Sequence, residues 1–159
     1  MKTVKTIVVL CLMLSLLVIG CGKKEEVPMQ MGNPWKEYAS LADAEEAAGF
    51  AFDLPEEIGG YEATAFRVMG GVLLEVTYQK GDTQVVVRKQ AGEGEDLSGV
   101  YETFRDVSSF DYFDGVITQK RRRDCHVMLI DKGGYSHSFY FPTEWVEEYT
   151  AFIDVMFEG

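Results

Sequence analysis

Most of the chain alternates between apolar and polar residues, which is the pattern of a strand with one buried face. Residues 72–79 show it best: four apolar residues, Val72, Leu74, Val76 and Tyr78, alternate with polar residues that would face the other side, Glu75, Thr77 and Gln79. This alternation predicts strands at residues 61–69, 72–79, 83–90, about 101–110, 115–122, 125–131 and 135–141.

Glycines mark the breaks between these stretches, as is typical of hairpin turns. We predict turns at Gly70-Gly71, residues 80–82, Asp114-Gly115, residues 122–124 and residues 132–134, with a polar loop at residues 91–99. Strands joined by such short connections are expected to pair with their sequence neighbours in antiparallel fashion.

Two stretches carry apolar residues at the spacing of an amphipathic helix. The pair Ser40 and Asp43 has the arrangement of a helix cap, and Gly49 suits a left-handed stop, so we predict a helix at residues 40–48. Near the end, Pro142-Thr143-Glu144 is a start signal, and an apolar stripe follows: Val146, Tyr149, Phe152, Ile153 and Met156.

Hairpins in series with a helix at each end predict an α+β domain over residues 35–159. We expect an antiparallel sheet of about six to seven strands, with the N-terminal and C-terminal helices packed on one face.

The first twenty residues have the three parts of a secretory signal peptide. Lys2 and Lys5 make a basic start, residues 7–19 are apolar apart from Ser15, and Gly20 is a small residue at the position of cleavage. A membrane-spanning helix needs about 20 apolar residues, so we interpret residues 1–20 as a cleaved signal rather than as an uncleaved anchor.

The residues Val18-Ile19-Gly20-Cys21 resemble the lipobox of bacterial lipoproteins, although leucine is commoner at the first position. The resemblance implies that the Cys21 thiol carries diacylglycerol and that the chain is cut between Gly20 and Cys21. At about 0.8 kcal/mol per buried methylene, two acyl chains would hold the protein at the outer face of the cytoplasmic membrane. Residues 21–34 read as a flexible tether between this anchor and the domain.

The chain is strongly acidic. Its formal net charge is −11, and because Lys2 and Lys5 lie in the signal, the remainder carries −13, which excludes nucleic acid as an expected partner. The exception is Lys120-Arg121-Arg122-Arg123, which we call the basic turn. We predict that it contacts an anionic wall polymer, lipid headgroups or an acidic patch on an envelope protein. The alternative is a solvated turn that the surrounding acids neutralise.

Cysteine and histidine are too few for most catalytic or metal sites. Cys11 lies in the signal and Cys21 would carry lipid, so Cys125 has no partner for a disulfide and reads as a small, half-buried apolar residue. Cys125 and His126 are strand neighbours that point to opposite faces, and contact between Cys125 and His137 depends on the register. We therefore expect no catalytic pair, no metal and no cofactor.

Aromatic residues are numerous in residues 101–113 and 135–141, and most should be core. Alternatively, a curved sheet would leave an apolar groove for a lipid or a peptide. Our first hypothesis is a non-enzymatic binding or interaction domain. The alternative is a carrier for a hydrophobic ligand, and a hydrolase is the more distant possibility.

Short segments match a known family: Asn33-Pro34-Trp35, Ser40-Leu41, residues 47–50, Leu54-Pro55, residues 71–78, Val87-Arg88-Lys89, Asp114-Gly115 and the tyrosine-bearing strand before the last helix. On these the mature chain is similar to uncharacterised Gram-positive lipoproteins, the exported domain of unknown function 4367. The resemblance implies an extracellular α+β domain and supplies no catalytic residues. It gives no role to Cys125 or to the basic turn.

Overall fold

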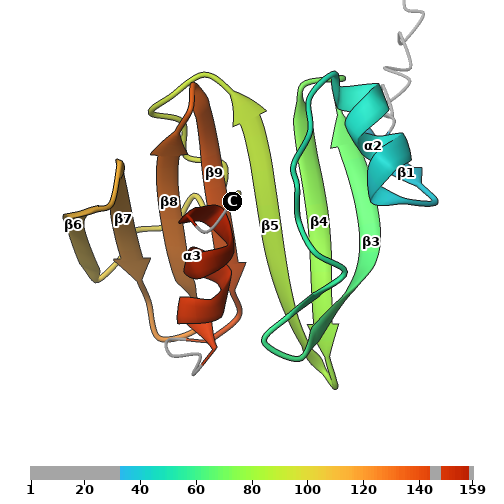
Figure 1. The fold of residues 1–159 in the computed structure, drawn as a ribbon. Helices are drawn as coiled ribbons and strands as arrows, with labels where there is room; N and C mark the ends of the chain where they lie inside the picture. The colour runs from blue at the N-terminus through green and yellow to red at the C-terminus, as the bar shows by residue number, and fades with distance from the viewer. Residues whose placement is uncertain (1–32, 144–147, 158–159) are drawn as a thin grey trace, which may run out of the picture. The chain divides into compact units, whose positions relative to one another are not determined.

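The computed structural model describes residues 33–143 and 148–157, which form a mostly antiparallel, open sheet of nine strands with two helices (Figure 1). In chain order the elements are β1 (Trp35–Tyr38), α2 (Leu41–Ala48), β2 (Glu57–Ile58), β3 (Tyr61–Met69), β4 (Leu73–Lys80), β5 (Thr83–Ala91), β6 (Asp106–Tyr112), β7 (Gly115–Arg121), β8 (His126–Lys132), β9 (Tyr135–Phe141) and α3 (Tyr149–Phe157).

Some predictions fall on other parts of the chain. The signal peptide, the Gly20–Cys21 junction and most of the tether lie outside the described residues, and so does the segment 144–147, where the second helix was predicted to begin. No helix within the described ranges is long and apolar enough to cross a membrane.

The sheet consists of two antiparallel meanders that meet in its middle. The strand order is β1-β3-β4-β5-β9-β8-β7-β6, with β2 also paired to β3, so β5 pairs with β9 and β6 ends the sheet. The chain between β5 and β6 therefore has to pass β9, β8 and β7. It crosses the sheet face that carries Asp131 and Ser136: Gly94 N donates to Asp131 Oδ1 at 3.0 Å and Glu95 N to Ser136 Oγ at 3.1 Å.

The helix α2 confirms the predicted capping signals. The Ser40 side chain accepts a hydrogen bond from Asp43 N at 3.2 Å, and Gly49 ends the helix in the left-handed region at φ 80°. Between these caps, Ala44 and Ala48 are buried. A small side chain at both positions allows the helix to lie close to β3 and β4.

Aromatic rings fill the core beside α3. Phe152 is fully buried, and its ring centroid lies 5.7 Å from that of Tyr78, 6.3 Å from Phe139 and 5.5 Å from Phe141. All of these contacts are edge-on, the arrangement that aromatic pairs prefer. Residues of α2 and α3 belong to the same hydrophobic core.

The predicted strand count was too low because β1 and β2 are too short to show a period. β1 has four residues and β2 has two, so neither contains enough alternation to be recognised. In contrast, the predicted bounds of β3 and β9 are confirmed. The stretch 101–105 is not strand, and β6 begins only at Asp106.

The predicted turn after β6 and the predicted start of β4 were each wrong by one position. The turn after β6 is Phe113-Asp114, and Gly115 already pairs with Tyr112 as the first residue of β7. Val72, predicted as the first residue of a strand, belongs to the turn before β4 and is 54% exposed. Glu75 lies on the face opposite Val76, as predicted, and is completely buried. The second face of the sheet is therefore covered at this point as well.

Candidate functional site

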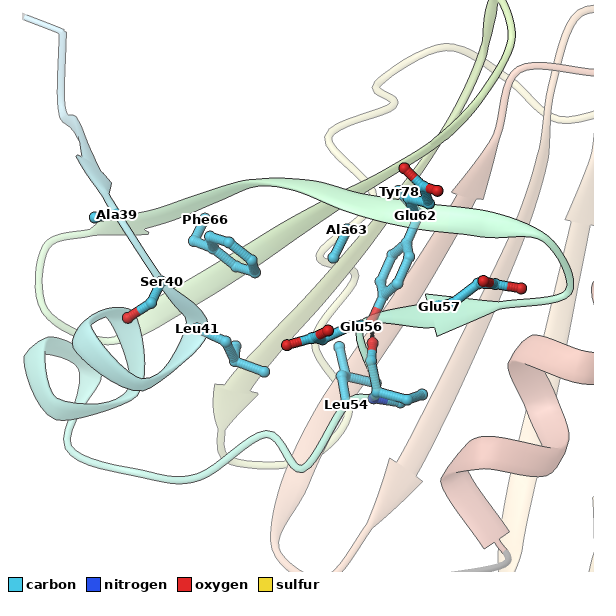
Figure 2. Close-up of a pocket in the computed structure, with 11 residues that line it drawn as sticks. Ala39, Ser40, Leu41, Leu54, Glu56, Glu57, Glu62, Ala63, Phe66 and Tyr78 are labelled. Atoms are coloured by element: carbon cyan, nitrogen blue, oxygen red, sulfur yellow. Dashed lines mark hydrogen bonds between the residues drawn. The ribbon is translucent and has the colours of Figure 1, made fainter.

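A groove of about 490 Å³ opens beside β3 (Figure 2). We call it the β3 groove. It is lined by residues from the end of β1, the start of α2, the segment leading into β2, and the strands β3 and β4: Ala39, Ser40, Leu41, Leu54, Pro55, Glu56, Glu57, Glu62, Ala63, Phe66 and Tyr78. It combines an apolar floor with a set of like charges, and this combination makes it the candidate site.

The groove exists because two short strands share one edge of β3. β1 pairs with the far part of β3, ending at Tyr38 opposite Phe66, and β2 pairs with its beginning, with Glu57 opposite Glu62. Between these pairings the register of β3 against β4 shifts after Ala63, as in a β-bulge. The chain thus leaves a gap along this edge, and the groove occupies that gap.

The floor of the groove is apolar and firmly held. Tyr78 is completely buried, and its hydroxyl donates to Pro55 O at 2.7 Å, shown as the dashed line below β3 in Figure 2. Burial raises the pKa of Tyr78, so the hydroxyl stays a neutral donor. Leu54 is also buried, while Phe66 and Leu41 are half-buried and face the opening.

Three exposed carboxylates border this floor, and the lining contains no basic residue. In Figure 2 Glu56 reaches into the hollow toward Leu41, while Glu57 and Glu62 lie at the far end on β2 and β3, with the Glu62 carboxylate on the other side of β3 from Ala63 and the Tyr78 ring. Glu57 and Glu62 face each other directly across the strand pair. Like charges in that position destabilise a sheet, and a cation between them would relieve this repulsion.

The sequence contained a signal for this arrangement. Gly59 and Gly60 both have positive φ, at 58° and 81°, and connect Ile58 to its partner Tyr61 in a two-residue hairpin. A Gly-Gly pair is a common hairpin turn, and recognising it would have placed Glu57 opposite Glu62. This turn is not among those that the alternation predicts, because the two residues before it show no alternation.

The basic turn is largely neutralised by acids nearby. Lys120 Nζ lies 2.7 Å from Asp96 Oδ2, and Arg122 holds Asp124 through two hydrogen bonds of 2.9 Å. Asp124 also raises the pKa of Arg122. Arg123 is exposed, whereas Arg121 is half-buried. The four cations therefore do not form one surface of free charge, and contact with an anionic partner stays a prediction.

The structure keeps Cys125 and His137 apart. His137 pairs with Ile130, five positions along the chain from Cys125, or roughly 16 Å at the rise of a strand. Cys125 is buried, which raises the pKa of its thiol and disfavours the reactive thiolate. Burial also lowers the pKa of both His126 and His137 to about 4. Neutral, buried imidazoles of this kind are core residues.

Other groups of potential ligands are dispersed. Within residues 33–143 and 148–157, no group of three or more His, Cys, Asp or Glu side chains is placed to hold a metal ion.

Comparison with models of protein families, with curated proteins and with solved structures finds no match to this chain.

Proposed function

We propose that this chain is a lipid-anchored bacterial lipoprotein whose single domain binds a basic peptide segment in the β3 groove. Cys21 would carry the anchor at the outer face of the cytoplasmic membrane, as the lipobox resemblance and the basic and apolar start of the chain support. The domain would belong to the α+β class, with both helices forming a layer on one face of the sheet, as the resemblance to the Gram-positive lipoprotein family also implies.

The observation that carries the proposal is the Glu57–Glu62 pair beside an apolar floor. Facing acids cost a sheet up to about 1 kcal/mol, and a cation between them turns that repulsion into two attractions. The gain comes only on binding, so the pair favours an occupied groove. Glu56 provides a third carboxylate on the same opening.

The apolar floor selects the kind of cation. Lysine and arginine carry a charged end on an apolar stem, and such stems lie against hydrophobic surface while the charge stays at a polar rim. Leu41, Leu54 and Ala63 offer the surface, and the Phe66 ring adds a face suited to a cation. The volume also lies in the range of about 300–1,000 Å³ that is usual for ligand pockets.

A hydrophobic carrier is the less favoured alternative. Such a protein needs an enclosed apolar cavity, and the space beneath α3 is filled by the fully buried rings of Phe139, Phe141 and Phe152. A lipid in the β3 groove would meet three uncompensated carboxylates.

Titration with two short peptides tests the binding proposal. We expect acetylated Lys-Leu-Lys-Leu, but not Glu-Leu-Glu-Leu, to bind the full-length chain in neutral detergent, with an affinity that falls as salt rises. Replacing both facing acids, Glu57→Gln with Glu62→Gln, should weaken binding at least tenfold, which corresponds to about 1.4 kcal/mol. Glu46→Gln is the matched control, because Glu46 is exposed on α2 outside the groove. Equal binding of the two peptides, or an equal loss with Glu46→Gln, contradicts the proposal.

The anchor is tested separately in cells. Cys21→Ser should move the protein from the membrane fraction to the soluble fraction, and Cys125→Ser should leave it with the membrane. A Cys21→Ser protein that still sediments with membranes would show that the lipid is not attached there.

A further inference from the structure

The two edges of the sheet differ in how well they are protected from pairing with another chain. On one side β1 and β2 are short, β3 carries a bulge, and α2 lies against β1, β3 and β4. These are the usual means by which proteins prevent an edge from pairing with another chain. The other side ends in β6, seven residues long, of which all but Tyr112 are exposed. In Figure 1 no described element lies beyond β6.

The turn into β7 fixes which backbone groups of β6 point outward. The two-residue turn Phe113-Asp114 closes on the pair Tyr112 and Gly115. Residues in an antiparallel pair alternate between bonding to their partner strand and pointing away from it. Because Tyr112 bonds to β7, the N–H and C=O groups of Val107, Ser109 and Asp111 are directed away from the sheet.

We propose that β6 pairs with β6 of a second copy of this chain, antiparallel and with Ser109 on the two-fold axis. This register pairs the whole strand. It places Ser109 opposite itself, Val107 opposite Asp111 of the second copy, and Asp106 opposite Tyr112 of the second copy. No two acids then face each other, although the strand contains two of them.

The strand's composition favours a second copy over a strand of another protein. The aspartates lie near its two ends, and pairing about Ser109 places uncharged residues of the second copy, Tyr112 and Val107, opposite both of them. β6 also contains no lysine and no proline, the residues that most often block edge pairing. A two-fold contact between equal strands is self-complementary by symmetry.

Exposed apolar side chains flank the same edge. Val107 is 61% exposed, Phe110 40% and Val116, on β7, 48%. In the proposed register Phe110 lies opposite Ser108 of the second copy and diagonal to its Phe110, about 7–8 Å away, which is within reach of an aromatic ring. Pairing therefore removes apolar surface from water on both faces, in addition to satisfying the backbone groups.

A charge exchange at the axis tests this interface. We expect the full-length chain to sediment as a dimer in density-matched detergent. Ser109→Lys and Ser109→Glu should each raise the dimer dissociation constant at least tenfold, because each places like charges opposite each other on the axis. An equimolar mixture of the two variants should recover the dimer, since lysine then faces glutamate.

The control uses the neighbouring serine. Ser108 is also exposed, but it faces Phe110 of the second copy and lies only diagonal to Ser108 of that copy, so mixing Ser108→Lys with Ser108→Glu should recover less dimer than mixing the two Ser109 variants. A wild-type chain that stays monomeric at every concentration overturns the proposal. Recovery with the Ser108 pair but not with the Ser109 pair overturns the register.

Cross-linking gives a second measurement that does not depend on charge. Across the axis the two Cα atoms of residue 109 would be about 5.5 Å apart, inside the range of about 4.4–6.8 Å that a disulfide spans. Ser109→Cys should therefore cross-link on mild oxidation, whereas Ser108→Cys and the wild-type chain should not. A Ser109→Cys chain that remains uncross-linked under these conditions contradicts the proposed axis.

Discussion

Glu75→Ala would remove the carboxylate that joins three strands on the second face of the sheet. Glu75 lies on β4 and is completely buried between two arginines, Arg67 on β3 and Arg88 on β5. Arg67 Nε donates to one carboxylate oxygen at 2.8 Å, and Arg88 Nε donates to the other at 2.7 Å. The Trp35 ring lies 5.1 Å from the first guanidinium and 5.7 Å from the second.

The expected loss of stability depends on the hydration and the hydrogen bonds that the two arginines keep once the Glu75 carboxylate is removed. Removing one member of a buried ion pair typically costs about 3–5 kcal/mol, because it leaves a buried charge without a partner. The side chains of Arg67 and Arg88 are 33% and 18% exposed, so both keep some hydration. Arg88 also keeps its bond to Leu97 O at 2.6 Å. We therefore expect the low end of the range, about 3 kcal/mol.

Urea unfolding of the full-length chain at pH 7 measures this cost. With a slope of about 2 kcal/mol per molar urea, the midpoint should fall by about 1.5 M. Glu46→Ala is the matched control, because Glu46 is exposed on α2 and its loss should change stability by no more than about 0.5 kcal/mol.

A combined variant separates the charge from the space it fills. Replacing all three residues, Glu75→Leu with Arg67→Met and Arg88→Met, should restore most of the stability, since apolar residues of similar volume often replace a buried ion cluster without loss. If Glu75→Ala lowers the free energy of unfolding by less than about 1 kcal/mol, the carboxylate does not compensate the charges of Arg67 and Arg88 in the way we argue.

Two further predictions concern the core. His126 and His137 have pKa values of about 4 in the folded protein against about 6.5 in the unfolded chain, so the unfolded state takes up protons first. Stability should be complete above pH 6.5 and fall toward pH 4 by about 3 kcal/mol per histidine, and His137→Leu should flatten this dependence. A wild-type urea midpoint that is equal at pH 7 and pH 4.5 contradicts it. Phe152→Ala should cost about 3–5 kcal/mol by opening a cavity, whereas Tyr101→Ala, at a residue 97% exposed, should cost little.

The elements that were predicted closely are those that depend on residues near one another in the chain. The alternation in β3 and the caps of α2 each depend on residues within a few positions of one another, and both were predicted closely. Pairing between β5 and β9 was not predictable in this way, because three other strands, β6, β7 and β8, lie between them in the chain. The position of β6 at an edge depends on the same long-range pairing.

The burial of Glu75 shows that alternation along a strand does not suffice to predict which residues are buried. Alternation assigned Glu75 correctly to the face opposite Val76, but it cannot indicate whether that face is covered. Arg88 contacts Leu97, in the segment that crosses this face of the sheet. Likewise, the neutralisation of Lys120 depends on Asp96, an acid from the same crossing segment. The sequence did not predict the β3 groove, because the groove forms only where β1 and β2 pair with the same edge of β3.

The two proposed contacts lie on opposite edges of the sheet, and this has a measurable consequence. β3 carries the groove and β6 carries the self-pairing edge, so a β6-paired dimer would leave both grooves accessible. A ligand with two basic segments on a sufficiently long Gly-Ser linker should then bind more tightly than one segment, by about 10²–10⁴-fold when the linker spans both sites.

Ser109→Lys distinguishes this gain from the affinity of a single groove. The variant should bind the single Lys-Leu-Lys-Leu peptide as the wild-type chain does, because Ser109 is not part of the groove lining. It should lose the added affinity for the linked peptide, since the second groove is no longer on the same particle. An unchanged affinity for the linked peptide would mean that the two edges act independently, and that pairing through β6 does not bring two grooves to one partner.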